Sequence, residues 1–201
     1  MEFVEGETLA QILAKSRNAE LAATTPFGAS REEVAFYLNV AKAFAEVADG
    51  LQHAHARGVT HRDIKPSNLI LDLQGRLRIL DFGLAHLEGQ ESITASGDLV
   101  GTVQYMSPEQ AQVRKIPIDH RTDIYSLGAT LYEMLTSCAP FKGKSHQDTL
   151  SQIIQRAPIE PRKINPRVPR DIETIVLKCL RKDPEDRYGT AEALSQDLRR
   201  F

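Results

Sequence analysis

Apolar residues recur every three or four positions along much of the chain, the spacing that places them on one face of a helix. Loops that contain proline or glycine separate these stretches. The pattern predicts helices over Thr8–Lys15, Ser30 to about Gly58, Asp123–Leu135, Ser145–Arg156, Asp171–Leu180 and Thr190–Phe201. We therefore expect most of the chain to be helical.

The second of these helices has the clearest boundaries. Ser30 and Glu33 form a capping-box pattern, and Gly58 can end the helix. Its predicted buried face consists of Val34, Leu38, Ala41, Ala45, Ala48 and Leu51. By contrast, the stretch Asp123–Leu135 is apolar nearly all round, so we expect it to be buried on several sides within the core.

Two short apolar runs, Leu69–Leu71 and Leu77–Leu80, flank the turn-forming sequence Asp72-Leu73-Gln74-Gly75. This arrangement predicts a small β-hairpin. Together with the helices, the hairpin places this chain of 201 residues in the α+β class, as one mainly helical domain.

Charge and cysteine content exclude several classes of function. The formal net charge is −2 and the basic residues are interspersed with acidic ones, so we expect no surface for nucleic acid or an anionic membrane. No apolar run reaches the ~20 residues that a membrane-spanning helix needs. Cys138 and Cys179 lie in apolar helical patterns, which favours buried thiols in a reducing compartment. We therefore expect a cytoplasmic chain, with membrane attachment of the full-length protein as the alternative.

Polar residues cluster on both sides of the predicted hairpin. The preceding loop carries Asp63, Lys65 and Asn68, and Asp81 directly follows the second strand. Taken alone, Asp63 and Asn68 are explained equally well as turn-forming residues. The hairpin, however, brings both loops to the same end of the structure. Oxygen atoms of Asn68 and Asp81 would then suit Mg²⁺, while Asp63 can accept a proton. Lys65 can offset charge on a transferring phosphoryl group.

These residues resemble the motifs of the eukaryotic-type, or Hanks-type, protein kinases. The stretch His61–Asn68 is similar to the catalytic loop, Asp81–Gly83 to the metal-binding motif, and Ser107–Glu109 to a variant of the Ala-Pro-Glu motif. The sequence Lys65-Pro66-Ser67-Asn68 is similar to the Ser/Thr branch. The stretch Gly101–Gln110 resembles the segment that holds the substrate peptide, most closely in bacterial members.

The resemblance implies a role for each motif residue. Asp63 would be the catalytic base, Lys65 the lysine that contacts phosphate, and Thr102 the hydroxyl that orients both. Asn68 and Asp81 would hold Mg²⁺, with ATP as the phosphoryl donor.

The resemblance also implies supporting roles. Glu109 would pair with Arg187, and Asp123 would bind the backbone of the catalytic loop, both as structural rather than catalytic contacts. The first residues of the chain resemble the hinge between the two kinase lobes, so backbone groups near Glu2 and Val4 would contact adenine.

Two further interpretations concern hydroxyls and histidines. Phosphorylation of Ser92, Thr94 or Ser96 could order the segment after Asp81 through a pair with Arg62, although an ordinary polar loop residue explains each single hydroxyl better. The remaining histidines are scattered without zinc-type spacing, and we interpret them as surface or packing residues. They are His53, His55, His86, His120 and His146.

The chain matches only part of the family's domain. No Gly-x-Gly-x-x-Gly sequence or strand lysine precedes the catalytic loop, so we expect residues 1–201 to comprise hinge, C-terminal lobe and activation segment without the β-rich N-terminal lobe. The implied function is transfer of the ATP γ-phosphoryl group to Ser/Thr hydroxyls of protein substrates. Without its partner lobe the chain would be weak or inactive, and the alternatives are a protein-binding scaffold of the pseudokinase type or a fragment without function.

Overall fold

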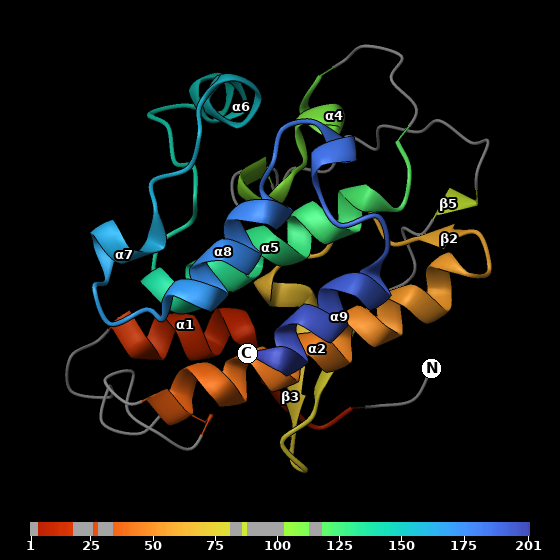
Figure 1. The fold of residues 1–201 in the computed structure, drawn as a ribbon, viewed down its shortest axis with the longest axis vertical. Helices are drawn as coiled ribbons and strands as arrows, with labels where there is room; N and C mark the ends of the chain where they lie inside the picture. The colour runs from red at the N-terminus through yellow and green to blue at the C-terminus, as the bar shows by residue number, and fades with distance from the viewer. Residues whose placement is uncertain (1–3, 18–25, 28–33, 81–85, 88–102, 113–117) are drawn as a thin grey trace.

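A computed structural model of the chain describes residues 4–17, 26–27, 34–80, 86–87, 103–112 and 118–201. These residues form a mainly helical body with a small sheet at one side, which confirms the predicted α+β class (Figure 1). The α-helices are α1 (Leu9–Arg17), α2 (Val34–His55), α4 (Pro108–Ala111), α5 (Arg121–Thr136), α6 (His146–Gln155), α7 (Pro161–Ile164), α8 (Arg170–Cys179) and α9 (Ala191–Arg200). Short 3₁₀ turns occur at η2 (Pro66–Asn68), η4 (Val103–Tyr105) and η5 (Pro184–Asp186).

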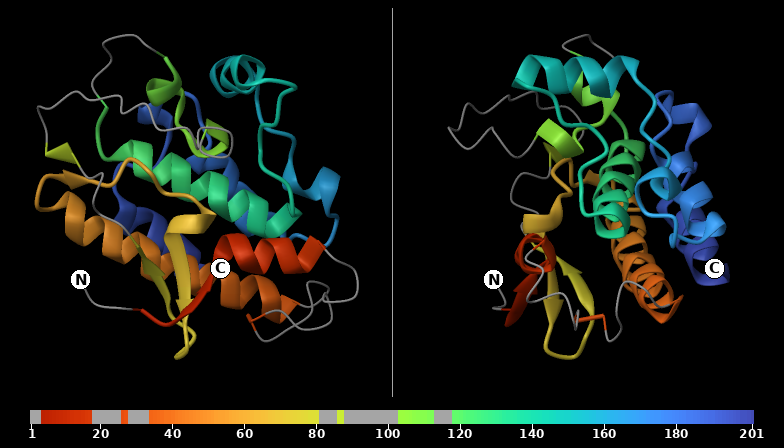
Figure 2. Two further views of the ribbon diagram at one scale, coloured as in Figure 1. Left: turned by 180° about the vertical axis from the view of Figure 1, so that it is seen from behind. Right: turned by 90° about the vertical axis from the view of Figure 1, so that its left-hand side faces the viewer.

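Helix α5 forms the centre of the core. Every residue from Thr122 to Thr136 is buried, as its apolar sequence predicts. Helices α2 and α8 contact α5, and α9 lies along α2, so the main body consists of helices packed on one another (Figures 1 and 2). None of the helices among the described residues is both long and apolar enough to cross a membrane.

The predicted buried face of α2 is partly wrong. Val34 and Leu38 are 64% and 45% exposed, whereas Phe36, Tyr37 and Phe44 are almost fully buried. The reason is that α2 contacts α5, α9 and the sheet, so several of its faces are covered along most of its length. Its proposed cap at Ser30 lies outside the described residues.

Capping contacts between residues close in sequence define the end of α2 and the starts of two later helices. Gly58 adopts a positive φ of 72° and its amide donates to the carbonyl of His55 at 2.9 Å. Ser145 and Thr190 act as N-caps of α6 and α9 by accepting hydrogen bonds from backbone amides.

The predicted hairpin is present as β3 (Leu69–Asp72) and β4 (Leu77–Ile79), paired antiparallel with Leu69 opposite Ile79. A third strand, β1 (Gly6–Thr8), pairs with the other edge of β3 and was not predicted. Gly6 suits this position because a Cβ there would lie 2.2 Å from the carbonyl oxygen of Leu71. A second, two-stranded sheet pairs β2 (Val59–Thr60) with β5 (His86–Leu87).

The two cysteines do not share one environment. Cys179 is buried in α8, as expected, and burial raises the pKa of its thiol to about 12. Cys138 is exposed, so its assignment to the core is wrong. The reason is that α5 ends at Thr136, and the C-cap residue Ser137 adopts a positive φ of 63° and turns the chain before Cys138.

Candidate active site

The loop between β2 and β3 brings three of the predicted site residues together. The Lys65 ammonium lies 2.8 Å from Oδ2 of Asp63, and both side chains are partly accessible. The Asn68 amide donates to the Asp63 carbonyl at 2.8 Å and to Asp63 Oδ2 at 3.0 Å. Asp63 is therefore held between a cation and an amide, with its carboxylate still reachable from solvent.

The orientation of Asn68 bears on metal binding. Its NH₂ group is committed to Asp63, which leaves the amide oxygen Oδ1 with a hydroxyl contact from Ser67 at 3.4 Å. An amide oxygen together with a carboxylate is an oxygen donor set that fits Mg²⁺. Leu80, the residue before Asp81, donates its amide to the Asn68 carbonyl at 2.8 Å, while Asp81 itself lies outside the described residues.

A buried carboxylate from α5 supports the catalytic loop. Asp123 is fully buried and accepts hydrogen bonds from the backbone amides of His61 at 2.9 Å and Arg62 at 2.7 Å. The predicted contact between Asp123 and this backbone is confirmed. Arg62 has a positive φ of 66°, a conformation that L-residues adopt rarely and that these bonds help to hold.

Two histidines complete this support, and only one of them belongs to a motif. His61 Nε2 bonds the Leu80 carbonyl at 3.1 Å, so Nε2 carries the hydrogen and Nδ1 can accept the amide of Asp63 at 3.3 Å. His55, near the end of α2, bonds Asp123 Oδ2 through Nε2 at 2.8 Å. The interpretation of His55 as a surface or packing residue misses this contact, because the sequence gives no sign that α2 and α5 meet here.

A second segment, residues 103–111, lies beside the catalytic loop. We call it the substrate segment, since it contains the described part of the stretch that resembles the peptide-holding segment of kinases. Gln110 donates through Nε2 to the Arg62 carbonyl at 2.8 Å, and Ser126 of α5 donates to the Tyr105 carbonyl at 2.8 Å. A cavity of about 40 Å³ separates the segment from Asp63, and Arg62 borders it. These contacts fix the segment to both the loop and the central helix.

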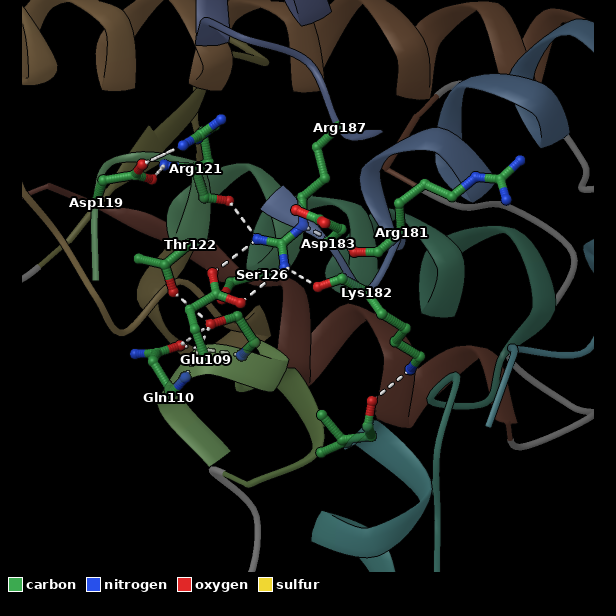
Figure 3. Close-up of polar contacts among 12 residues, drawn as sticks. Glu109, Gln110, Asp119, Arg121, Thr122, Ser126, Arg181, Lys182, Asp183 and Arg187 are labelled. Atoms are coloured by element: carbon green, nitrogen blue, oxygen red, sulfur yellow. Dashed lines mark hydrogen bonds and ion pairs between the residues drawn. The ribbon is translucent and has the colours of Figure 1, made fainter. Parts of the chain in front are cut away.

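An ion pair anchors the far end of the substrate segment. Both nitrogens Nη1 and Nη2 of Arg187 lie 2.7 Å from the Glu109 carboxylate, and both side chains are at least 96% buried (Figure 3). The remaining N–H groups of Arg187 donate to the carbonyls of Arg181, Lys182 and Arg121. The predicted pair is therefore confirmed, and all five donors of the guanidinium are used.

Other predicted site residues lie apart from this cluster or outside the described part. Val4 is half-buried and precedes β1, in which Gly6 lies opposite Asp72 and Thr8 opposite Ile70. Val4 is thus placed beyond the Asp72 end of β3, while Asn68 adjoins the other end of that strand. Glu2 and Thr102 lie outside the described residues. The candidate phosphorylation sites Ser92, Thr94 and Ser96 do so as well.

Comparison with known protein families identifies the arrangement. A family model described as the protein kinase domain matches residues 1–198. The chain belongs to the protein kinase family. This match confirms the resemblance drawn from the catalytic-loop, metal-binding and Ser-Pro-Glu motifs, and with it the kinase-like fold.

Individual protein kinases give the same result. The chain is 36% identical over 201 residues to a probable serine/threonine-protein kinase of Clostridium perfringens, covering 100% of this chain and 27% of that protein. It is 39% identical over 155 residues to the serine/threonine-protein kinase PknB of Mycobacterium leprae, covering 77% of this chain and 25% of that protein. It is also 39% identical over 170 residues to the tyrosine-protein kinase MasK of Myxococcus xanthus, with 81% and 26% covered.

The chain spans about a quarter of the length of these curated relatives. They support the bacterial-like, Hanks-type character predicted from the motifs.

Proposed function

We propose that the chain provides the catalytic residues of a kinase that transfers the γ-phosphoryl group of ATP to Ser or Thr hydroxyls of proteins. The observation that carries this proposal is the cluster of Asp63, Lys65 and Asn68 in one loop, beside the substrate segment. The relatives named as serine/threonine kinases add support for the choice of hydroxyl.

In this proposal Asp63 accepts the proton of the incoming hydroxyl. Its carboxylate is accessible enough to meet a substrate, and the bonds from Lys65 and Asn68 limit its orientation. Lys65 places a positive charge next to the reacting hydroxyl, where negative charge develops on the transferring group. Support from Asp123 keeps the loop in its strained conformation, so little reorganisation is needed during the reaction.

The nucleotide would lie along the sheet side of the chain. Bound Mg²⁺ and ATP would supply the transferable phosphoryl group and neutralise its charge. Asn68 and Asp81 are the proposed metal ligands, and backbone groups near Glu2 and Val4 are the proposed adenine contacts. Val4 and Asn68 lie toward opposite ends of β3, which suits an extended nucleotide whose base and phosphates are bound at separate points. Thr102 is proposed to orient Asp63 and Lys65.

We further propose protein substrates as the partners and the cytoplasm as the place of action. The two unpaired thiols support this location. The net charge of −2 gives no support to a nucleic-acid partner.

The test uses the full-length protein with the substitution Asp63→Asn. Loss of the base should lower the rate of phosphate transfer to a protein substrate by about 10²–10⁴-fold, because amide nitrogen and oxygen cannot accept the proton. Transfer of radiolabelled γ-phosphate measures this rate, and phosphoamino-acid analysis identifies the acceptor hydroxyl. Asp171→Asn, an exposed aspartate at the start of α8, is the matched control and should leave the rate unchanged.

Calorimetry with Mg²⁺ and ATP separates catalysis from binding. Asp63→Asn should still bind the nucleotide, whereas Asp81→Ala should bind it weakly. A folded wild-type protein that neither transfers phosphate nor binds ATP would contradict the enzyme and favour a protein-binding scaffold. Phosphate transfer that survives Asp63→Asn would contradict the assignment of the base.

A further inference from the structure

We propose that Lys182 is a positioning residue that holds both supports of the substrate segment at once. Its backbone carbonyl accepts a hydrogen bond from Arg187, which anchors the substrate segment. Its ammonium donates a hydrogen bond to α6, the helix that packs against this segment. This inference rests on the proposed function, because the substrate segment is the part that would hold the protein substrate.

The backbone contact involves the ion pair of Glu109 and Arg187. Arg187 Nη2 donates to the Lys182 carbonyl at 3.0 Å and to Glu109 Oε2 at 2.7 Å (Figure 3). Glu109 belongs to α4, the last part of the substrate segment. The position of Lys182 thus helps to set where the guanidinium meets α4.

The side-chain contact involves α6. Lys182 Nζ donates to the carbonyl oxygen of Ile153 and lies 4.0 Å from the centre of the Phe141 ring. Ile153 belongs to the last turn of α6, where carbonyl groups lack the partners that the next helical turn would supply. Figure 3 shows the Lys182 side chain extending away from Arg187 towards this helix.

Helix α6 lies at the edge of the described part of the protein, against the substrate segment. It lies outside the main helical body in Figure 1 and in the left view of Figure 2, and the buried residues of α6 are Thr149 and Ile153. Its packing partners include η4 and α4, the two ends of the substrate segment. A contact that fixes the end of α6 therefore also fixes the surface against which the segment rests.

The surroundings of Lys182 destabilise the charged form of its ammonium group. Burial and the nearby Arg187 charge lower its pKa from 10.5 to about 8. No carboxylate forms an ion pair with it within the described ranges, and Glu109 is engaged by Arg187. An apolar residue would fill the same space without this cost, so a contact that needs a donor explains the lysine better.

The test compares Lys182→Met with the wild type in the full-length protein. Loss of the donor should raise KM for a protein or peptide substrate about tenfold while KM for ATP stays within about twofold. Hydrogen exchange should become faster in the last turn of α6 and in residues 103–111, because both lose a shared support. Lys182→Arg, which keeps a cationic donor of similar reach, should restore most of both properties.

Lys178→Met is the matched control. Lys178 also lies 4.0 Å above an aromatic ring, that of Tyr188, but is exposed and belongs to α8. Its loss should change neither KM nor exchange in α6. If Lys182→Met does not fold, Lys182→Gln replaces it in the same measurements.

Three outcomes would overturn the inference: unchanged exchange in both regions, an equal rise in KM for ATP and substrate, or equal effects of the two methionine variants. Exchange is measured without turnover, so it tests Lys182 even if the wild type transfers no phosphate. Absence of phosphate transfer by the wild type would contradict the proposed function and leave the role of Lys182 unaffected.

Discussion

Asp72 controls the turn that joins the two strands beside the catalytic loop. Its Oδ1 accepts hydrogen bonds from the backbone amides of Gln74 at 3.0 Å and Arg76 at 2.9 Å. Its Oδ2 accepts a hydrogen bond from Nε of Arg78 at 2.7 Å. Gly75 completes the turn with a positive φ of 75°. One carboxylate therefore satisfies the donors of the turn and holds the arginine of the neighbouring strand.

The same contacts predict a pH dependence of stability. The hydrogen bond from Arg78, followed by the Arg76 amide, lowers the pKa of Asp72 from 3.8 to about 2. Because the folded-state value is the lower one, the stabilisation is present above about pH 4 and is lost as the pH falls towards 2. Urea unfolding at pH 5 and at pH 2.5 should show a smaller loss of stability in Asp72→Asn than in the wild type. An equal loss in both proteins would contradict this role.

At the residue scale, the sequence identifies groups whose function depends on near neighbours. Asp72 and Gly75 act within a few residues of their partners, and Asp63, Lys65 and Asn68 occupy one short loop. His55 differs because its partner Asp123 is distant in sequence. Because His55 also belongs to none of the motifs that indicated the distant pair of Glu109 and Arg187, only the structure reveals its contact.

Helices α5 and α8 approach each other closely at one glycine. A Cβ added to Gly128 would lie 2.3 Å from Cβ of Cys179 and 3.5 Å from its sulfur. The absence of a side chain therefore sets the separation of the two helices, and the burial of Cys179 follows from the same contact.

Gly128→Ala tests this close approach. Alanine favours a helix by about 1 kcal/mol over glycine, but forcing α5 and α8 apart should cost more, for a net destabilisation of about 1–3 kcal/mol. Gly50→Ala in α2 is the matched control, since its Cβ would lie 3.6 Å from Ile79 in ordinary contact. This control should be stabilised by up to about 1 kcal/mol. Chemical denaturation measures both free energies of unfolding, and equal gains in stability would contradict the close contact.

At the element scale, long periodic segments are predictable and short paired ones are not. The apolar sequence of α5 and the hairpin pattern specify these elements locally. Strand β1 has the sequence Gly-Glu-Thr, which carries no strand pattern and becomes a strand only by pairing with β3. The exposed Val34 and Leu38 have a similar explanation, because neighbouring elements rather than the helix period decide which part of α2 is covered.

At the scale of the whole molecule, Glu133 joins parts that are far apart in sequence. This residue of α5 is buried. Its carboxylate accepts hydrogen bonds from Nη2 of Arg17 at 2.5 Å and from the hydroxyl of Tyr105 at 2.5 Å. Arg17 ends α1, and Tyr105 ends η4 within the substrate segment. Burial and the Glu133 charge raise the pKa of Tyr105, so its hydroxyl remains a donor. The sequence did not indicate this junction, since its members are separated along the chain and belong to no shared motif.

Glu133→Gln should therefore weaken two distant regions together. A neutral amide binds the guanidinium and the phenol less strongly, and we expect a destabilisation of about 2–3 kcal/mol. Hydrogen exchange should accelerate in both α1 and η4, because each loses its contact with α5. Glu160→Gln, which breaks an exposed pair with Lys163, should change stability by no more than about 0.5 kcal/mol. Faster exchange in only one region would show that α1 and the substrate segment are held independently, whereas acceleration in both would make Glu133 their common anchor on the central helix.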